Sequence, residues 1–203
     1  MNRLAGDDTI TLDHMDLKHL PTINTSRLSL RSIRTEDVDD FYDVYSNPQV
    51  MRYWSTPPLA DKEAARKLIN EIQTDVQRHD IMKWGIALGT DDKLIGSVTL
   101  FRLDFTHHRA EIGYAQGRPY WGNGYMQEAL TAVINYAFAE LKLHRIEADV
   151  DPRNDGSVRT LERLGFQREG YLRERWQVNG EIQDAFFYGL LRPDWEAAKT
   201  IHN

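Results

Sequence analysis

The residue types best suited to chemistry gather in the stretch "YWGNGYMQEAL", residues 120–130. Gly122 and Gly124 stand one residue apart there, after an apolar run and before a segment with helical spacing. Glycine lets the backbone approach a ligand closely, and the first amides of a helix point outward at the positive end of its dipole. The stretch therefore has the chemistry of an anion-binding turn.

The residues around the glycines limit which ligands such a turn can bind. A P-loop places lysine and serine or threonine where this sequence has Asn123 and Gly124, so the groups that bind phosphate and magnesium are missing. A dinucleotide-binding turn needs a third glycine where Gln127 stands, and it opens a βαβ unit rather than following a hairpin. Two interpretations remain: an ordinary turn without a ligand, and a pyrophosphate held on backbone amides, such as that of coenzyme A.

A long helix is predicted directly after this turn. Its apolar positions follow each other in alternating steps of three and four residues, which places them on one face. They are Met126, Ala129, Leu130, Val133, Ile134, Ala137, Phe138 and Leu141. Shorter helices are expected at residues 35–47, with Thr35 as N-cap, at 61–76, and at 157–164, where Gly165 ends the helix.

The remaining pattern predicts strands. Alternating or continuous apolar runs occur at residues 27–33, 83–89, 93–103, 109–117 and 144–151. A closing hairpin is expected over residues 170–191, because Asn179-Gly180 between two strand-like runs favours a type I′ turn. We therefore predict an α+β domain with one mixed, mostly antiparallel central sheet flanked by helices.

Composition limits the class of protein. The 203 residues are 41% hydrophobic, which is enough for one sizeable core. The sequence has no cysteine, and its seven histidines show no metal-ligand spacing. A net charge of −6 argues against general nucleic-acid binding. We expect a cytoplasmic protein without a metal or a membrane segment, either a monomer or a homodimer.

Five fragments, taken in order, resemble a known family. They are "TSRLSLRSIRTEDVDDFYDVYSNPQVMRYW", "IGSVTL", "AEIGYAQGRPYWGNGYMQEAL", "DPRNDGSVRTLERLGFQREG" and "NGEIQDAFFYGLL". Together they are similar to the GNAT superfamily of N-acetyltransferases, in its ribosomal-protein N-terminal (serine/alanine) acetyltransferase-like branch. The resemblance covers residues 25–195. It leaves residues 1–24 as an N-terminal arm and 196–203 as a C-terminal tail, and it implies a GNAT fold with a splayed pair of strands.

The resemblance implies acetyl-CoA as co-substrate. Trp121 stands where the family's phosphate loop usually has Gln or Arg, and Met126 stands at its last small position, so backbone amides must hold the pyrophosphate. The residues implied at the turn are Trp121, Gly122, Asn123, Gly124, Tyr125 and Met126. The family's splayed strand binds the pantetheine arm and the thioester carbonyl. By position it corresponds to Tyr114, Ala115 and Gln116, where an unpaired amide would act as oxyanion donor.

Three further residues are candidates for proton transfer. By resemblance, Asn154 binds the pantetheine and Ser157 donates a proton toward the leaving sulfur, although both can also serve simply to cap the short helix. For the base, Trp176 appears at the family's glutamate position. Glu174 is a substitute on the same strand face, and Glu111 at the start of the splayed strand is a second candidate.

These residues predict direct transfer of an acetyl group from acetyl-CoA to a primary amine in a ternary complex. The branch resemblance implies the N-terminal α-amine of a protein or peptide. An α-amine has a pKa of about 8 against about 10.4 for lysine, so it is the easier nucleophile at neutral pH. A small-molecule amine such as a polyamine, an amino acid or an antibiotic is the nearest alternative. A non-catalytic coenzyme-A-binding module is a third.

Overall fold

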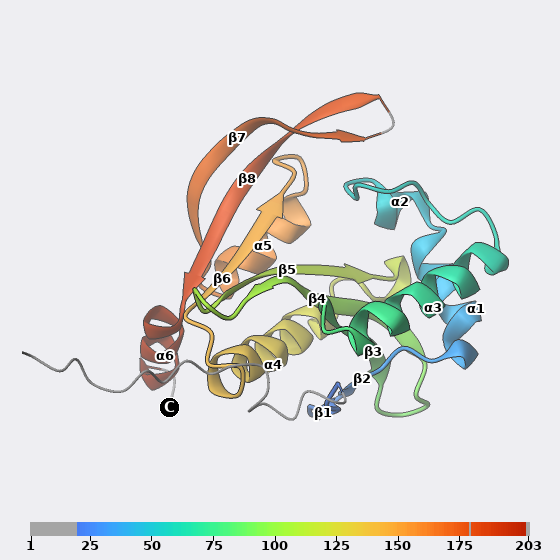
Figure 1. The fold of residues 1–203 in the computed structure, drawn as a ribbon, viewed down its shortest axis with the longest axis horizontal. Helices are drawn as coiled ribbons and strands as arrows, with labels where there is room; N and C mark the ends of the chain where they lie inside the picture. The colour runs from blue at the N-terminus through green and yellow to red at the C-terminus, as the bar shows by residue number, and fades with distance from the viewer. Residues whose placement is uncertain (1–19, 179, 202–203) are drawn as a thin grey trace, which may run out of the picture.

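The structure, a computed structural model, describes residues 20–178 and 180–201. Its centre is one sheet of eight strands in the order β1-β2-β3-β4-β5-β6-β8-β7 (Figure 1). The strands are β1 (Ile23–Asn24), β2 (Leu28–Arg31), β3 (Ile81–Leu88), β4 (Leu94–Asp104), β5 (Arg109–Gln116), β6 (Arg145–Val150), β7 (Gln167–Val178) and β8 (Glu181–Leu191). Only β5 and β6 run parallel to each other. The predicted mixed, mostly antiparallel sheet is therefore confirmed.

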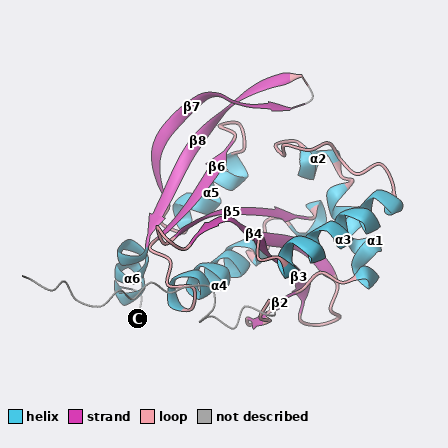
Figure 2. Cartoon of the chain, in the orientation of Figure 1, coloured by secondary structure: helices cyan, strands magenta, loops and turns pink. Residues whose placement is uncertain are grey.

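Helices cover both faces of this sheet (Figure 2). They are α1 (Val38–Tyr45), α2 (Pro48–Met51), α3 (Lys62–Gln77), α4 (Tyr125–Ala139), α5 (Asp155–Arg163) and α6 (Arg192–Ile201), with short 3-10 turns at Thr35–Asp37 and Arg118–Tyr120. Helices α1 to α3 pack on one face and α4 to α6 on the other. The α+β class follows from this arrangement.

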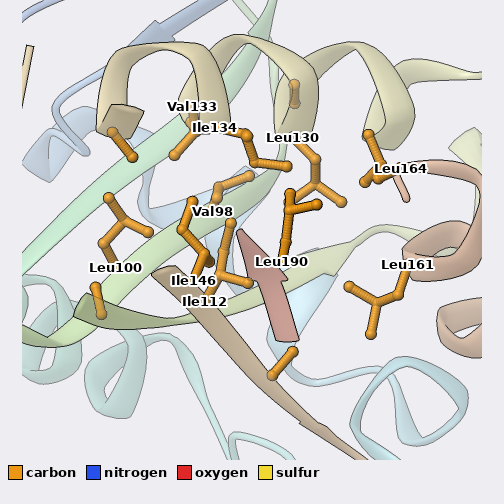
Figure 3. Close-up of a cluster of buried hydrophobic side chains, with 14 of the residues drawn as sticks. Val98, Leu100, Ile112, Leu130, Val133, Ile134, Ile146, Leu161, Leu164 and Leu190 are labelled. Carbon is orange, nitrogen blue, oxygen red and sulfur yellow. The ribbon is translucent and has the colours of Figure 1, made fainter. Parts of the chain in front are cut away.

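The larger core lies under α4. Leu130, Val133 and Ile134 of α4 are fully buried, as the helical spacing predicts. They point at strand residues from both halves of the sheet, including Val98 of β4 and Ile146 of β6 (Figure 3). Helix α4 is therefore held rigidly across the sheet, and its first turn has a fixed position.

The N-terminal elements differ from the sequence-based expectation in two respects. Residues 35–37 form a 3-10 turn, and the Asp37 carboxylate accepts the Arg34 amide proton (2.7 Å), so Thr35 is not the N-cap of this helix. Ile23 and Asn24, which were expected in the arm, pair with β2 as β1. Residues 1–19 of that arm lie outside the described residues.

The C-terminal elements largely agree with the expected boundaries. Gly165 after α5 has the left-handed backbone (φ 86°) that a helix-ending glycine needs. The hairpin of β7 and β8 is present, with Gly180 at φ 83°, whereas Asn179 of its predicted turn lies outside the described residues. Helix α6 continues past residue 195, where the tail was expected to begin.

The pairing of β5 with β6 is short. It joins only residues 109–111 to residues 145–147, after which the two strands separate. β5 continues to residue 116 paired with β4 alone, while β6 continues paired with β8. This opening is the splayed pair that the family resemblance implied.

Candidate active site

The glycine turn lies at the end of the splayed strand, between β5 and α4. Gly122 and Gly124 have φ values of 78° and 76°, a backbone region that glycine adopts without strain. Gly124 is the N-cap of α4, and no side chain caps the first amides of that helix. A Cβ placed on Gly122 would meet nothing within 4 Å. The glycines are thus needed for backbone shape, and the space beside the turn is open.

The side chains of the turn are occupied with the turn itself. The Trp121 indole Nε1 donates to the Gln116 carbonyl (2.6 Å). The Asn123 amide donates to the carbonyls of Tyr120 (3.1 Å) and Trp121 (3.2 Å). These contacts leave backbone amides as the donors available to a ligand here.

An ion pair that the sequence did not reveal joins this turn and α4 to the turn between β1 and β2. The Glu128 carboxylate accepts hydrogen bonds from Thr25 Oγ1 (2.6 Å), Ser26 Oγ (3.0 Å) and Arg27 Nε (2.6 Å). Arg27 Nη1 also donates to the Asn123 carbonyl (2.9 Å). Burial alone would raise the pKa of Glu128, but these hydrogen bonds outweigh it and lower the pKa to about 2.

The splayed part of β5 carries the three strand residues predicted for coenzyme binding. Tyr114, Ala115 and Gln116 all lie beyond residue 111, where pairing with β6 ends. Their backbone groups on the β6 side have no partner strand. Ala115 and Gln116 instead approach β4 so closely that a Cβ on Gly96 would lie 2.3 Å from the Ala115 carbonyl oxygen. The strand edge is therefore held in place and left open on one side.

The start of α5 meets this edge. Asn154 caps the helix, its Oδ1 accepting the Ser157 amide proton (3.2 Å). The Ser157 hydroxyl lies 2.6 Å from the Tyr114 hydroxyl. Burial raises the pKa of the Tyr114 phenol well above its usual range, against the opposing effect of the Ser157 hydrogen bond. Asn154 thus caps the helix, whereas the Ser157 hydroxyl is directed to Tyr114, and both residues line one cavity.

A cavity of about 410 Å³ opens beside these residues. β3 to β6 contribute residues to its lining, with Asn154 and Ser157 at the start of α5. Its remaining walls come from the segment after α2, with Tyr53 and Trp54, and from the β7–β8 hairpin, with Trp176 and Gln183. In Figure 1 the hairpin and the segment after α2 both lie above β5, whereas α4 lies below it. A second reactant can therefore reach the splay from the side opposite α4.

The two candidate bases occupy different environments. Glu111 lines the cavity, and its Oε1 accepts from Arg102 Nη1 (2.6 Å). Glu174 is exposed and lies in a bulge of β7, with φ 52° and a register shift between Leu172 and Trp176. The bulge breaks the alternation on which the equivalence of Glu174 and Trp176 was based. Trp176 lines the cavity, whereas Glu174 does not.

Lys83 is a cavity residue that the sequence analysis missed. It lies in β3, is only 9% exposed, and lies 5.3 Å from the centre of the Tyr45 ring. The signal was present in "IMKWGIAL", where one lysine interrupts an otherwise apolar strand. The Arg27–Glu128 pair had no such local signal, because its members are 101 residues apart.

The described residues contain no group of three or more histidine, aspartate or glutamate side chains suited to a metal. The residues of the glycine turn and the β5 edge do fit a coenzyme that carries a pyrophosphate and an extended thioester arm. The turn offers uncapped amides in open space, and the β5 edge offers unpaired backbone groups. In the part of the chain that the structure describes, no helix is long and apolar enough to cross a bilayer.

Comparison with known proteins identifies the family. Residues 27–167 match the acetyltransferase (GNAT) domain. N-acetyltransferase p20 of Bacillus licheniformis, itself uncharacterized, is 35% identical over 87% of this chain and 99% of its own. The chain belongs to the GNAT family and is an N-acetyltransferase. Members of this family use acetyl-CoA and an amine acceptor.

The names of two relatives state their acceptors, and a solved structure shares the fold. The [ribosomal protein uS5]-alanine N-acetyltransferase of Escherichia coli is 29% identical, over 85% of this chain and 92% of its own. The spermidine N(1)-acetyltransferase of Vibrio cholerae is 28% identical, over 78% and 90%. A GNAT-family acetyltransferase structure from Bacillus anthracis has a TM-score of 0.74 at 28% identity, covering 84% of this chain and 98% of that one. The predicted GNAT fold is confirmed.

Proposed function

We propose that this enzyme transfers the acetyl group of acetyl-CoA to the N-terminal α-amine of a protein or peptide. The observation that carries the proposal is the cavity of about 410 Å³, which meets the splayed strand where Tyr114 and Ser157 lie. The coenzyme turn follows the end of this strand, and the cavity opens beside the strand. An amine in the cavity can thus attack directly, and the sequence has no cysteine to carry an acetyl group.

In this proposal the turn and the splayed strand bind the coenzyme. Backbone amides along residues 121–126 hold the pyrophosphate, helped by the dipole of α4. The free edge formed by Tyr114, Ala115 and Gln116 pairs with the pantetheine arm, and Asn154 contacts the same arm. An unpaired amide of this edge stabilises the negative charge that develops on the thioester oxygen.

Ser157 supplies the proton that the leaving sulfur needs. As the amine nitrogen bonds to the acetyl carbon, the carbon–sulfur bond breaks and the sulfur leaves as a thiolate. The Ser157 hydroxyl lies 2.6 Å from the Tyr114 hydroxyl, and burial keeps the pKa of that phenol high, so Tyr114 stays protonated. Tyr114 can then restore the proton of Ser157 once it has been donated, and the phenolate takes a proton from water, while the proton of the amine leaves through the base.

Glu111 is the base that we favour, because it lines the cavity and Glu174 does not. It would take the proton of the attacking amine, directly or through water. We expect Glu111→Gln to lower kcat at least tenfold and to alter the acid limb of the rate profile. Glu174→Gln, in the exposed bulge, is the matched variant. Loss of activity in Glu174→Gln alone would assign the role of the base to Glu174.

The acceptor is supported by the relative that acetylates the alanine of ribosomal protein uS5. A polyamine is the second candidate, since a spermidine acetyltransferase is nearly as similar. A simple charge count favours it, because four carboxylates line the cavity: Glu111, Asp149, Asp151 and Asp184.

Thiol release from acetyl-CoA tests the proposal, since the protein contributes no thiol of its own. One panel of acceptors holds peptides that begin with Ser, Ala, Thr or Met, and the other holds spermidine and small amines. We expect turnover on a peptide that disappears when its N-terminus is acetylated beforehand. Turnover on small amines alone would reject the α-amine acceptor while leaving the acetyltransferase activity in place.

A further inference from the structure

Lys83 stands out among the charged residues of the acceptor cavity because it has no partner of opposite charge. The residue is nine-tenths buried, and its ammonium group forms no hydrogen bond and no ion pair among the described residues. Its recorded contact is with the face of the Tyr45 ring, 5.3 Å from the centroid. A buried ammonium without an anion is costly, and such groups are normally paired.

The four carboxylates of the cavity are already engaged. Glu111 pairs with Arg102 at 2.6 Å, and Asp151 pairs with Arg153 at 2.6 Å. Asp184 accepts hydrogen bonds from the Tyr171 hydroxyl and the Glu174 amide. The simple charge count therefore overstates the attraction of this cavity for a cation.

The fourth carboxylate, Asp149, is paired through one oxygen only. Its Oδ2 pairs with Arg175 at 3.0 Å, whereas its Oδ1 is buried and has no hydrogen-bond partner among the described residues. Lys83 is thus the lining charge whose counter-ion is missing from the described residues.

We propose that the acceptor amine carries a carboxylate that pairs with Lys83. The inference rests on the proposed function and specifies its substrate class: an amine with a nearby acidic group, rather than a polyamine. The carboxylate can belong to an acidic side chain of a peptide or to a free amino acid. Both sources present the same anion to the same ammonium, and the experiment below separates them.

The position of Lys83 suits this role. Lys83 of β3, Thr99 of β4 and Gly113 of β5 lie opposite one another in the sheet register. Gly113 is in the splayed part of β5, next to Tyr114. An anion at Lys83 therefore lies two strands away from the edge that receives the thioester, across a cavity floor made of a small side chain and a glycine. One molecule can place its amine at the edge and its carboxylate at Lys83.

A paired set of acceptors tests this inference by thiol release. Peptides with Asp or Glu as the second, third or fourth residue are compared with the same peptides carrying Asn or Gln. Free aspartate and glutamate are compared with their amides, and spermidine serves as the cationic reference. We expect kcat/KM to be about ten- to a hundredfold higher for one class of carboxylate acceptor, the usual effect of a charged hydrogen bond.

Variants at residue 83 assign the preference to its charge. Lys83→Met keeps the length of the side chain and removes its charge, and we expect it to lower kcat/KM on the carboxylate acceptors to the value measured on their amide twins with the same variant. Lys83→Arg keeps the charge and should retain most of the preference. Lys67→Met, at a lysine of α3 whose side chain is 79% exposed, is the control for a lost surface charge. Melting temperatures confirm that each variant is folded.

Equal rates on carboxylate and amide acceptors, a preference that survives in Lys83→Met, or a preference for spermidine would each overturn the inference. Absence of transfer to every acceptor would instead count against the proposed function. In that case calorimetric titration of an acidic peptide and its amide twin into the coenzyme-A-bound protein still decides about Lys83. Tighter binding of the acidic peptide, lost in Lys83→Met, supports the inference, and equal binding rejects it.

Discussion

At the scale of single residues, the contact of Tyr114 with Ser157 joins the splayed strand to the start of α5. The phenol is buried, and burial raises its pKa, so it carries a proton within hydrogen-bond distance of the Ser157 hydroxyl. A serine hydroxyl alone is a weak acid, so a second hydroxyl within hydrogen-bond distance supplies what it lacks.

We predict that Tyr114→Phe lowers kcat about ten- to a hundredfold and changes the KM for acetyl-CoA little. The variant removes one oxygen atom and keeps the ring that fills the core. Tyr188→Phe is the matched control, because the Tyr188 hydroxyl also forms a side-chain hydrogen bond, to the Glu162 carboxylate (3.1 Å), but lies outside the cavity. Steady-state kinetics of both variants distinguishes a role in proton transfer from a general loss of buried hydrogen bonding.

At the scale of elements, two glycines with the same backbone conformation allow the effect of backbone shape to be distinguished from the effect of ligand binding. Gly122 and Gly180 both have a left-handed backbone and open space where a Cβ would lie. The first is at the proposed pyrophosphate site, and the second is in the hairpin turn. Alanine at either position costs about 1 kcal/mol of strain, because a Cβ disfavours positive φ.

We predict that Gly122→Ala raises the KM for acetyl-CoA about tenfold, as for the loss of one charged hydrogen bond. With acetyl-pantetheine, which has no phosphate, the same variant should behave like the wild type. Gly180→Ala should lose similar stability and keep its KM for both donors. An equal rise in the KM for both donors in Gly122→Ala would show that the turn does not hold the pyrophosphate.

The N-terminal strand and α4 are joined through Glu128, whose folded-state pKa of about 2 lies below the ordinary value of 4.5. A carboxyl with a depressed folded pKa contributes stability above its unfolded pKa and loses it as the pH falls toward the folded pKa. We predict that Glu128→Gln lowers the free energy of unfolding by roughly 2 kcal/mol at pH 7, allowing for the exposure of Arg27.

The difference between wild type and Glu128→Gln should shrink between about pH 4.5 and pH 2, where the wild-type carboxyl becomes protonated. Denaturant titrations at several pH values measure this difference in the free energy of unfolding. Glu71→Gln, which removes an exposed pair with Lys67 at 3.9 Å, should cost little at any pH. A constant difference across this range would mean that the Glu128 contacts do not depend on its charge.

Elements also show where sequence-based prediction succeeded and where it failed. Regular apolar spacing in α4 and the glycine turn predicted that helix and its position, because period and turn chemistry are local. The bulge at Glu174 was not predicted, since a local register shift depends on the partner strand. The Arg27–Glu128 pair was missed for the same reason: its partners meet only in the folded chain.

At the scale of the whole molecule, the proposed coenzyme and acceptor sites meet at β5 and the start of α5. The acceptor walls come from the segment after α2 and from the β7–β8 hairpin, whereas the coenzyme groups come from β5, the turn and α5. Changes in the walls should therefore affect the acceptor alone.

We predict that Trp176→Ala raises the KM for the acceptor about tenfold and leaves the affinity for acetyl-CoA unchanged, because Trp176 lines only the acceptor cavity. Ile182→Ala, in the same hairpin at a side chain that is 59% exposed and outside the cavity, should change neither value. Acceptor kinetics together with calorimetry of coenzyme binding checks both. Weakened coenzyme binding in Trp176→Ala would show that the two sites share this wall.

The short pairing of β5 with β6 makes the sheet two sheets joined over three residue pairs. Helix α4 packs on strands of both halves (Figure 3), and beyond residues 111 and 147 the two strands are no longer paired. A pulling force applied across the middle of the sheet would act on this short seam. A pantetheine arm bound in the gap would add backbone hydrogen bonds where β5 and β6 form none with each other. The mechanical strength of the folded enzyme would then depend on whether its coenzyme is bound.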